Sequence, residues 1–167
     1  MLSPKTLEAL NRHLNRELYS AYLYLAMSAH FETKSLSGMA NWMRIQFQEE
    51  LQHAYKFFDF VNERQGKVDL LAIDAPPATW DSPLQVFQQA GEHEAQVTDW
   101  INELADLAQQ ESDHATGTFL QWFITEQIEE ESTVQTIVDR LKMVGDNSAL
   151  LFMIDDQLGQ RALAPAV

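Results

Sequence analysis

Hydrophobic residues recur at three- and four-residue spacing through most of the 167-residue chain, the repeat that places them on one face of an α-helix. The repeat covers four long segments and a short fifth one, at about 4–31, 39–65, 83–110, 114–144 and 149–158. The four long segments are similar in length, about 40 Å each if helical. They predict an all-α fold, a four-helix bundle with a short C-terminal fifth helix.

Residues that start and stop helices support these boundaries. Ser3-Pro4 and Ser82-Pro83 each place a capping hydroxyl directly before a proline suited to the first helical turn. Gly66 and Gly145 follow the second and fourth segments, where glycine commonly ends a helix. The segment 67–82 has no helical repeat, and its length allows it to cross the whole bundle. We therefore predict two antiparallel hairpins joined by one long crossover.

Composition fits a single domain over residues 1–167, with 46% hydrophobic and 22% charged residues. The absence of cysteine excludes disulfides and thiolate metal sites, so carboxylates, imidazoles or amides must hold any metal. A net charge of −14 disfavours nucleic acid and anionic membranes as partners. The chain shows no signal peptide and no run of 18 apolar residues, and we expect a cytoplasmic protein.

Each long segment carries polar residues on the face that its repeat predicts to be buried. They are Glu17 in the first segment, Glu50 and His53 in the second, Glu94 in the third, and Gln127 and Glu130 in the fourth. In an antiparallel hairpin, residues equally distant from the turn lie at the same height. All six lie about 15 to 19 residues from turns expected near residues 34 and 112. The sequence therefore predicts one polar layer at the middle of the bundle.

Taken singly, a glutamate on such a face is commonly a boundary residue that reaches water, and a lone core histidine is commonly just hydrogen-bonded. Four carboxylates in one buried layer would instead carry a large desolvation cost and repel one another. A bound multivalent cation removes both costs. Glutamates with one Glu-x-x-His pair and no sulfur are the ligands expected for two iron ions in a helical bundle.

The predicted centre divides the layer between two irons. One iron is assigned to Glu17, Glu50 and His53, and the other to Glu50, Glu94 and Glu130, which makes Glu50 the bridging ligand. Gln127 is expected to hydrogen-bond a bound oxygen species or water. Tyr24, one heptad after Glu17, and Trp122 are either core packing or residues that pass electrons to the centre.

Two further groups of polar residues are open to more than one interpretation. Glu49, Glu126 and Glu129 flank the layer, and a run of acids is commonly a solvated face. With Glu130, these three could instead bind a third metal at the edge of the bundle. The remaining histidines have no partner at metal-ligand spacing, and we predict that they lie at the surface: His13, His30, His93 and His114.

The motifs that carry these residues resemble those of bacterial non-haem ferritins over nearly the whole chain. They are residues 17–24, 49–54 and 119–123, Glu94, and the pairs Glu126-Gln127 and Glu129-Glu130. The resemblance implies a hollow shell of 24 subunits that oxidises Fe(II) with O₂ or H₂O₂ at an intrasubunit di-iron ferroxidase centre and stores Fe(III) mineral. It maps the two-iron ligands onto Glu17, Glu50, His53, Glu94 and Glu130, and a third iron onto Glu49, Glu126, Glu129 and Glu130.

Departures from related families narrow the prediction. Bacterioferritins carry a haem-ligating Met directly after the Glu of the first Glu-x-x-His motif. This chain has Leu51 at that position, after Glu50, so no haem is expected. They also carry a second Glu-x-x-His, where this chain has Gln127 and Glu130. A di-iron oxidase or oxygenase acting on an organic substrate is the alternative, although such enzymes usually have two of these motifs. A non-catalytic helical interaction module is the third possibility.

Overall fold

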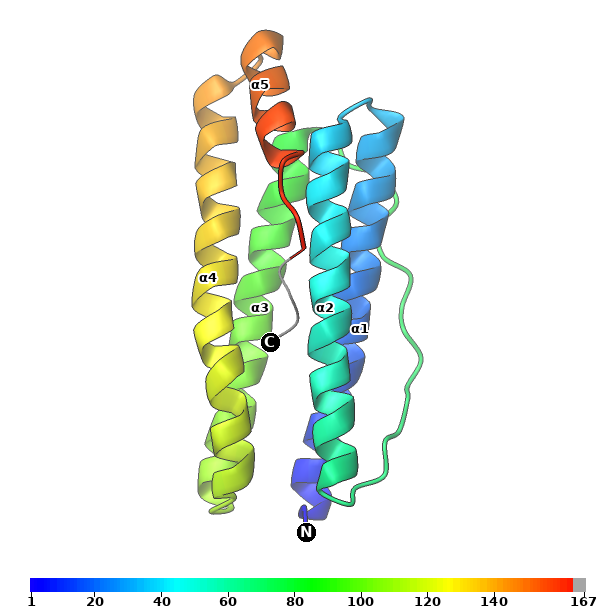
Figure 1. Cartoon of the computed structure of the whole chain (residues 1–167), viewed down its shortest axis with the longest axis vertical. Helices are drawn as coiled ribbons and strands as arrows, with labels where there is room; N and C mark the ends of the chain where they lie inside the picture. Colours follow the sequence, from blue (N-terminus) through cyan, green and yellow to red (C-terminus); the bar gives the residue numbers. More distant parts are fainter. Residues whose placement is uncertain (164–167) are drawn as a thin grey trace.

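The computed structural model describes residues 1–163, so the last four residues of the predicted domain 1–167 lie outside the described part. Residues 1–163 form five α-helices and no strand: α1 Pro4–Thr33, α2 Ser37–Glu63, α3 Pro83–Gln110, α4 His114–Val144 and α5 Ser148–Leu158. The four long helices lie side by side, with α5 at one end (Figure 1). The predicted all-α four-helix bundle with a short fifth helix is confirmed. No described helix combines the length and apolar character needed to span a membrane.

The predicted helix starts are made by the expected hydroxyls. Ser3 Oγ accepts a hydrogen bond from the backbone N–H of Thr6 at 3.0 Å, and Ser82 Oγ accepts from that of Gln85 at 3.2 Å. The end of α2 differs from the prediction, because Gln65 rather than Gly66 takes the positive φ, at 58°. A Cβ on Gly66 would lie 2.7 Å from a methyl carbon of Leu7, so this glycine allows close packing instead.

The long connection between α2 and α3 runs along the outside of α1 from one end of the bundle to the other (Figure 1). Two asparagines of α1 hold it in place. Asn11 accepts from the N–H of Asp69 at 3.0 Å and donates to the carbonyl of Lys67 at 2.9 Å. Asn15 repeats the pattern one turn later, with the N–H of Leu71 at 2.8 Å and the carbonyl of Asp69 at 3.2 Å. The predicted crossover is therefore an ordered part of the fold.

The hydrophobic core consists of two separate clusters along the bundle. One contains Tyr24, Met43, Phe87 and Val134, and the other contains Leu14, Phe57, Val97 and Phe123. On every long helix, the predicted polar residues lie in sequence between members of the two clusters. The polar layer therefore separates two apolar regions.

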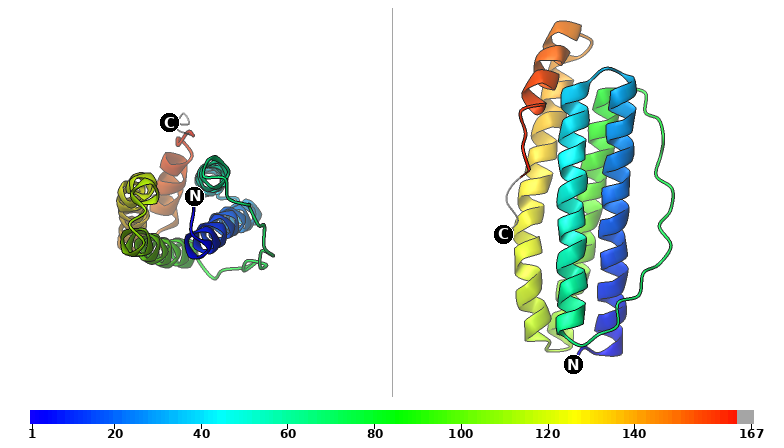
Figure 2. Two further views of the ribbon diagram at one scale, coloured as in Figure 1. Left: turned by 90° about the horizontal axis from the view of Figure 1, so that it is seen from below. Right: turned by 45° about the vertical axis from the view of Figure 1, so that its right-hand side comes forward.

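α5 packs against the start of α2. Asp155 accepts hydrogen bonds from the N–H groups of Gly38 at 3.2 Å and Met39 at 2.8 Å, and so caps a helix whose own N-cap residue makes no side-chain bond. A Cβ on Gly38 would lie 1.7 Å from the Asp155 carbonyl oxygen, so only glycine permits this approach. Viewed from below, α5 and residues 159–163 lie on the side between α2 and α4 (Figure 2).

Candidate metal centre

All six residues predicted for the polar layer are buried. Their exposed fractions lie between 1 and 4%, for Glu17, Glu50, His53, Glu94, Gln127 and Glu130. Such low exposure rules out the interpretation that these glutamates are boundary residues whose carboxylates reach water. The helical repeat therefore identified the buried faces of the four helices correctly.

One half of the layer is built by α1 and α2. Glu50 and His53 are one turn apart on α2, and the His53 Nδ1 atom lies 3.4 Å from Glu50 Oε2 and 3.9 Å from Glu17 Oε2. One ligand atom from each of these three residues lies within 4.8 Å of the others. Among residues 1–163, this is the one group of three or more His or acidic residues whose ligand atoms meet that closely. A single metal ion fits such a set of nitrogen and oxygen donors.

The other half contains Glu94 on α3 and Glu130 on α4. Glu94 accepts hydrogen bonds from the Tyr24 hydroxyl and from Gln127 Nε2, the latter at 3.1 Å. Glu130 accepts from Gln46 Nε2 at 2.9 Å. These amides and the phenol hold both carboxyl groups in the interior. These donors carry no positive charge, so they orient the two carboxyl groups without forming an ion pair with them.

Gln46 is a residue that the sequence analysis did not single out. Its side chain is completely buried, and its Oε1 atom has no hydrogen-bond partner among the described residues. Gln46 lies one heptad before His53 on α2, so its position in the same buried column was a usable signal.

Burial shifts the titration of every acid in the layer upward. It raises the pKa of Glu17, that of Glu50 to about 7 and that of Glu94 to about 8, where the charge of Glu50 adds to the effect. Burial, with the charges of Glu94 and Glu50, also raises the pKa of Glu130 well above its ordinary value. Burial would lower the pKa of His53, but the Glu50 carboxylate outweighs it and raises that pKa to about 10. All of these shifts favour the protonated form of the group concerned.

The prediction that four histidines lie at the surface holds only for His114, which is exposed. His13 is completely buried and His30 is 7% exposed. His93 is half-buried, with its Nε2 atom 2.7 Å from Ser20 Oγ. Histidines that lack a partner at metal-ligand spacing also fill helix interfaces, so this spacing does not determine whether a histidine is exposed.

His13 is in direct contact with the layer. Its Nε2 atom lies 2.7 Å from Glu17 Oε1, one turn along α1. Burial lowers the pKa of His13 to about 3, so its ring is neutral. The spacing of four residues before Glu17 was the signal in the sequence that could have revealed this contact.

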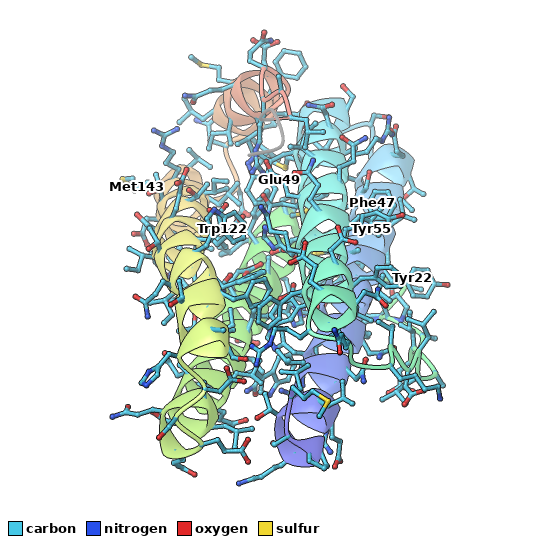
Figure 3. All side chains as sticks on the ribbon, turned by 60° about the horizontal axis from the view of Figure 1, so that its bottom comes forward. Tyr22, Phe47, Glu49, Tyr55, Trp122 and Met143 are labelled. Atoms are coloured by element: carbon cyan, nitrogen blue, oxygen red, sulfur yellow. The ribbon has the colours of Figure 1, made fainter. Side chains whose placement is uncertain are left out.

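Two aromatic residues contact the layer. Tyr24 is fully buried, and burial together with the charge of Glu94 raises the pKa of its hydroxyl well above the ordinary value, so the phenol keeps its proton. Trp122 is half-buried, with its ring 5.3 Å from the ring of His53, edge to face. Figure 3 shows Trp122 beside α4 on the side toward α2. Both rings make polar or ring contacts with the layer in addition to core packing.

The structure does not gather the residues predicted for a third metal into one group. Glu49 is half-buried and its Oε2 atom lies 2.6 Å from Arg161 Nη2, while Glu126 is half-buried and Glu129 is exposed. Figure 3 shows Glu49 on the side of α2 that faces α4. Arg161 is held there by its guanidinium, which lies 4.6 Å from the ring of Trp42. We call Glu49, Glu126 and Glu129 the rim acids.

Comparisons with known proteins agree with this architecture. Residues 7–144 match the Ferritin family, described as a ferritin-like domain. The chain is 45% identical to a bacterial non-heme ferritin of Bacteroides fragilis over 96% of this chain and 100% of the relative, and 37% identical to one of Staphylococcus aureus over 96% and 97%. It superimposes on an open-pore ferritin of Archaeoglobus fulgidus with a TM-score of 0.96 and 50% identity, over 97% of this chain and 99% of that one. An engineered closed form of the same ferritin gives a TM-score of 0.97 at 50% identity, over 98% and 100%. The chain belongs to the ferritin family.

Proposed function

We propose that this protein stores iron and is a ferroxidase, which oxidises Fe(II) at the polar layer before the iron is deposited as Fe(III) mineral. One observation carries the proposal. Four glutamates and one histidine from four helices lie buried between two apolar clusters, and the ligand atoms of Glu17, Glu50 and His53 lie within 4.8 Å of one another. The bacterial non-heme ferritins among its relatives support the same function.

We propose a set of donors for each of two Fe(II) substrates. Glu17, Glu50 and His53 are proposed to bind one iron, and Glu94 and Glu130 the other, with Glu50 shared. Each Fe(II) gives up one electron, and O₂ takes up two electrons and two protons to leave as H₂O₂. When H₂O₂ is the oxidant, it takes up two electrons and two protons and leaves as water. The proposal includes release of Fe(III) from this centre to the stored mineral.

Two neighbours are proposed to assist the second iron. Gln127 donates to Glu94 from its amide, and this places the amide where it can also meet an oxygen species or water at the centre. The Tyr24 hydroxyl donates a hydrogen bond to the other Glu94 oxygen. If the ring loses an electron, this oxygen can accept the hydroxyl proton. We propose Tyr24 as an electron donor on this basis.

A third iron is proposed at Glu130 and the rim acids, with lower affinity than the first two. The reason is an ion pair with Arg161, whose Nη2 atom lies 2.6 Å from Glu49 Oε2. A cation that binds Glu49 must compete with this ion pair. A third iron is therefore expected only after the two central positions have filled.

We propose a shell of 24 subunits around the mineral, working in the cytoplasm without haem. Apolar side chains on α5 favour contact with a neighbouring subunit. Leu150, Phe152 and Met153 are between 42 and 68% exposed in the single chain, a cluster that an isolated protein would rarely leave uncovered.

Anaerobic titration with Fe(II), followed by air, tests the proposed function. We expect two Fe(II) ions per subunit to bind tightly, a transient visible absorption on oxidation, and retention of many further irons per subunit inside a large particle. Retention of no more than two irons per subunit would contradict storage and favour the alternative, an oxidase or oxygenase acting on an organic substrate. Light scattering measures the particle size independently.

A further inference from the structure

Glu17 presents its two carboxylate oxygens to different surroundings. Oε1 lies 2.7 Å from His13 Nε2. Oε2 has no hydrogen-bond partner among the described residues, is buried, and lies 3.9 Å from His53 Nδ1. The side chain is therefore fixed at one oxygen and open at the other, toward the proposed metal centre.

The direction of the hydrogen bond follows from the second ring nitrogen. His13 Nδ1 is buried and has no partner among the described residues. A proton on Nε2 gives the ring's N–H group an acceptor in Glu17 and leaves only a lone pair unpartnered, which costs less than an unpartnered N–H. A Glu17 carboxylate bound to metal can only accept. His13 therefore donates to Glu17 when the centre is loaded.

The ring of His13 has little freedom to leave this position. Its centroid lies 4.6 Å from that of Phe57, and Phe57 in turn packs at 4.5 Å against Phe123. His13 and Phe57 are both completely buried. An imidazole held this way fixes both the position and the plane of the carboxylate to which it donates.

We propose that His13 is a positioning residue, which holds Oε1 of Glu17 so that this glutamate offers Oε2 alone to the metal centre. The inference rests on the proposed function only in that Glu17 is taken as a ligand. His13 lies beyond the ligands and reaches the metal through Glu17. Since residues that orient ligands commonly contribute 10- to 100-fold to metal affinity, we expect an effect of about that size.

The test compares His13→Leu, which removes the donor, with His13→Gln, which keeps an amide N–H. Binding of Co(II) is measured by calorimetry and by visible absorption, which reports the coordination of the ion. We expect His13→Leu to lower affinity about 10- to 100-fold and to change the Co(II) spectrum, while His13→Gln restores both to within about threefold. The matched control is His30→Leu, because His30 is also a buried histidine of α1 and contacts Trp80 and Phe31. This variant should leave the Co(II) affinity and the Co(II) spectrum unchanged.

Unchanged affinity and spectrum in His13→Leu would overturn the proposal. If this variant does not fold, a crystal structure of the unaltered chain loaded with Co(II) decides the question. We expect Glu17 to bind through Oε2 with its Oε1 still hydrogen-bonded to His13, and binding through Oε1 or through both oxygens would refute the inference. Absence of Co(II) from the layer of the unaltered chain would instead contradict the proposed function.

Discussion

The polar layer and the rim acids are built from the same residue type at adjacent positions, yet their surroundings are opposite. Glu49 and Glu50 are neighbours on α2, as Glu129 and Glu130 are on α4. One residue turns an α-helix by about 100°, which carries Glu50 and Glu130 into the interior and leaves Glu49 and Glu129 outside it. The comparison shows that burial, rather than the number of acids, distinguishes the proposed metal centre.

The two regions also differ in how their charge is balanced. At the rim, Arg161 binds Glu49 and solvent reaches Glu129. In the layer, the donors to Glu94 and Glu130 are a phenol and two amides, none of which carries a positive charge. The layer therefore gains far more than the rim from a bound cation, because water does not screen its charges.

The strongest test of whether burial distinguishes the polar layer from the rim acids is to remove one charge from each, at adjacent positions of α2. We expect Glu50→Gln to slow Fe(II) oxidation at least about 100-fold, since even residues that merely support a ligand contribute up to that much. Glu49→Gln, the matched control, should change the initial rate less than about twofold. Rates are measured by stopped-flow absorption at two irons per subunit. Comparable losses in the two variants would show that burial does not separate the two regions.

The stability of the metal-free protein should depend on pH because of the layer. Burial raises the pKa of Glu50 to about 7 and of Glu94 to about 8, so between pH 4.5 and 8 these two groups bind more protons in the folded state than in the unfolded state. Burial also lowers the pKa of His13 to about 3 and of His93 to about 4, which opposes this effect below pH 6.5 but is smaller than the effect of the buried acids. The free energy of unfolding therefore falls as pH rises through this window. We expect a fall of at least about 1.4 kcal/mol, the equivalent of one pKa unit.

Guanidinium denaturation of the metal-free protein at pH 5 and pH 8 measures this change. Glu50→Gln should reduce the fall, whereas Glu129→Gln, an exposed rim acid, should leave it as it is in the unaltered chain. A free energy of unfolding that rises from pH 5 to pH 8 would be the opposite of the expected sign.

The smallest predicted effect concerns metal binding at the rim acids. Arg161→Gln removes the partner of Glu49, and partly exposed ion pairs of this kind contribute about 1 kcal/mol or less. We therefore expect a third divalent ion to bind up to about fivefold more tightly in this variant, by calorimetry with Zn(II). Arg44→Gln, which breaks the pair between Arg44 and Glu32, is the control and should leave the third ion unaffected. Identical binding in both variants would argue against competition at Glu49.

The fold and the layer were predictable because both depend on local periodicity. Helical spacing gives the buried face, and distance from each turn gives the height of Glu17 and Glu94 in their hairpins. Long-range partners have no such signal. Arg161 lies 112 residues from Glu49, and Gln46 lies 84 residues from Glu130, so no local pattern connects either pair.

His13 escaped prediction for a different reason. It lies within the buried face of α1, four residues before Glu17, but a histidine there fits either a packed interface or a hydrogen bond to the next turn. The structure shows both, because α2 brings Phe57 against the ring while Nε2 lies 2.7 Å from Glu17 Oε1. Residue spacing alone does not reveal this combination, because it depends on packing between helices.

The central claim is that the buried acids form one layer that a captured pair of cations stabilises. Calorimetric titration of the metal-free protein with Zn(II) at pH 7, repeated in buffers of different ionisation enthalpy, tests it most directly. The raised pKa values of Glu94, Glu130 and His53 predict that two bound ions displace about two or more protons per subunit. Binding of fewer than two ions at the layer, or heats that are identical in every buffer, would contradict the claim.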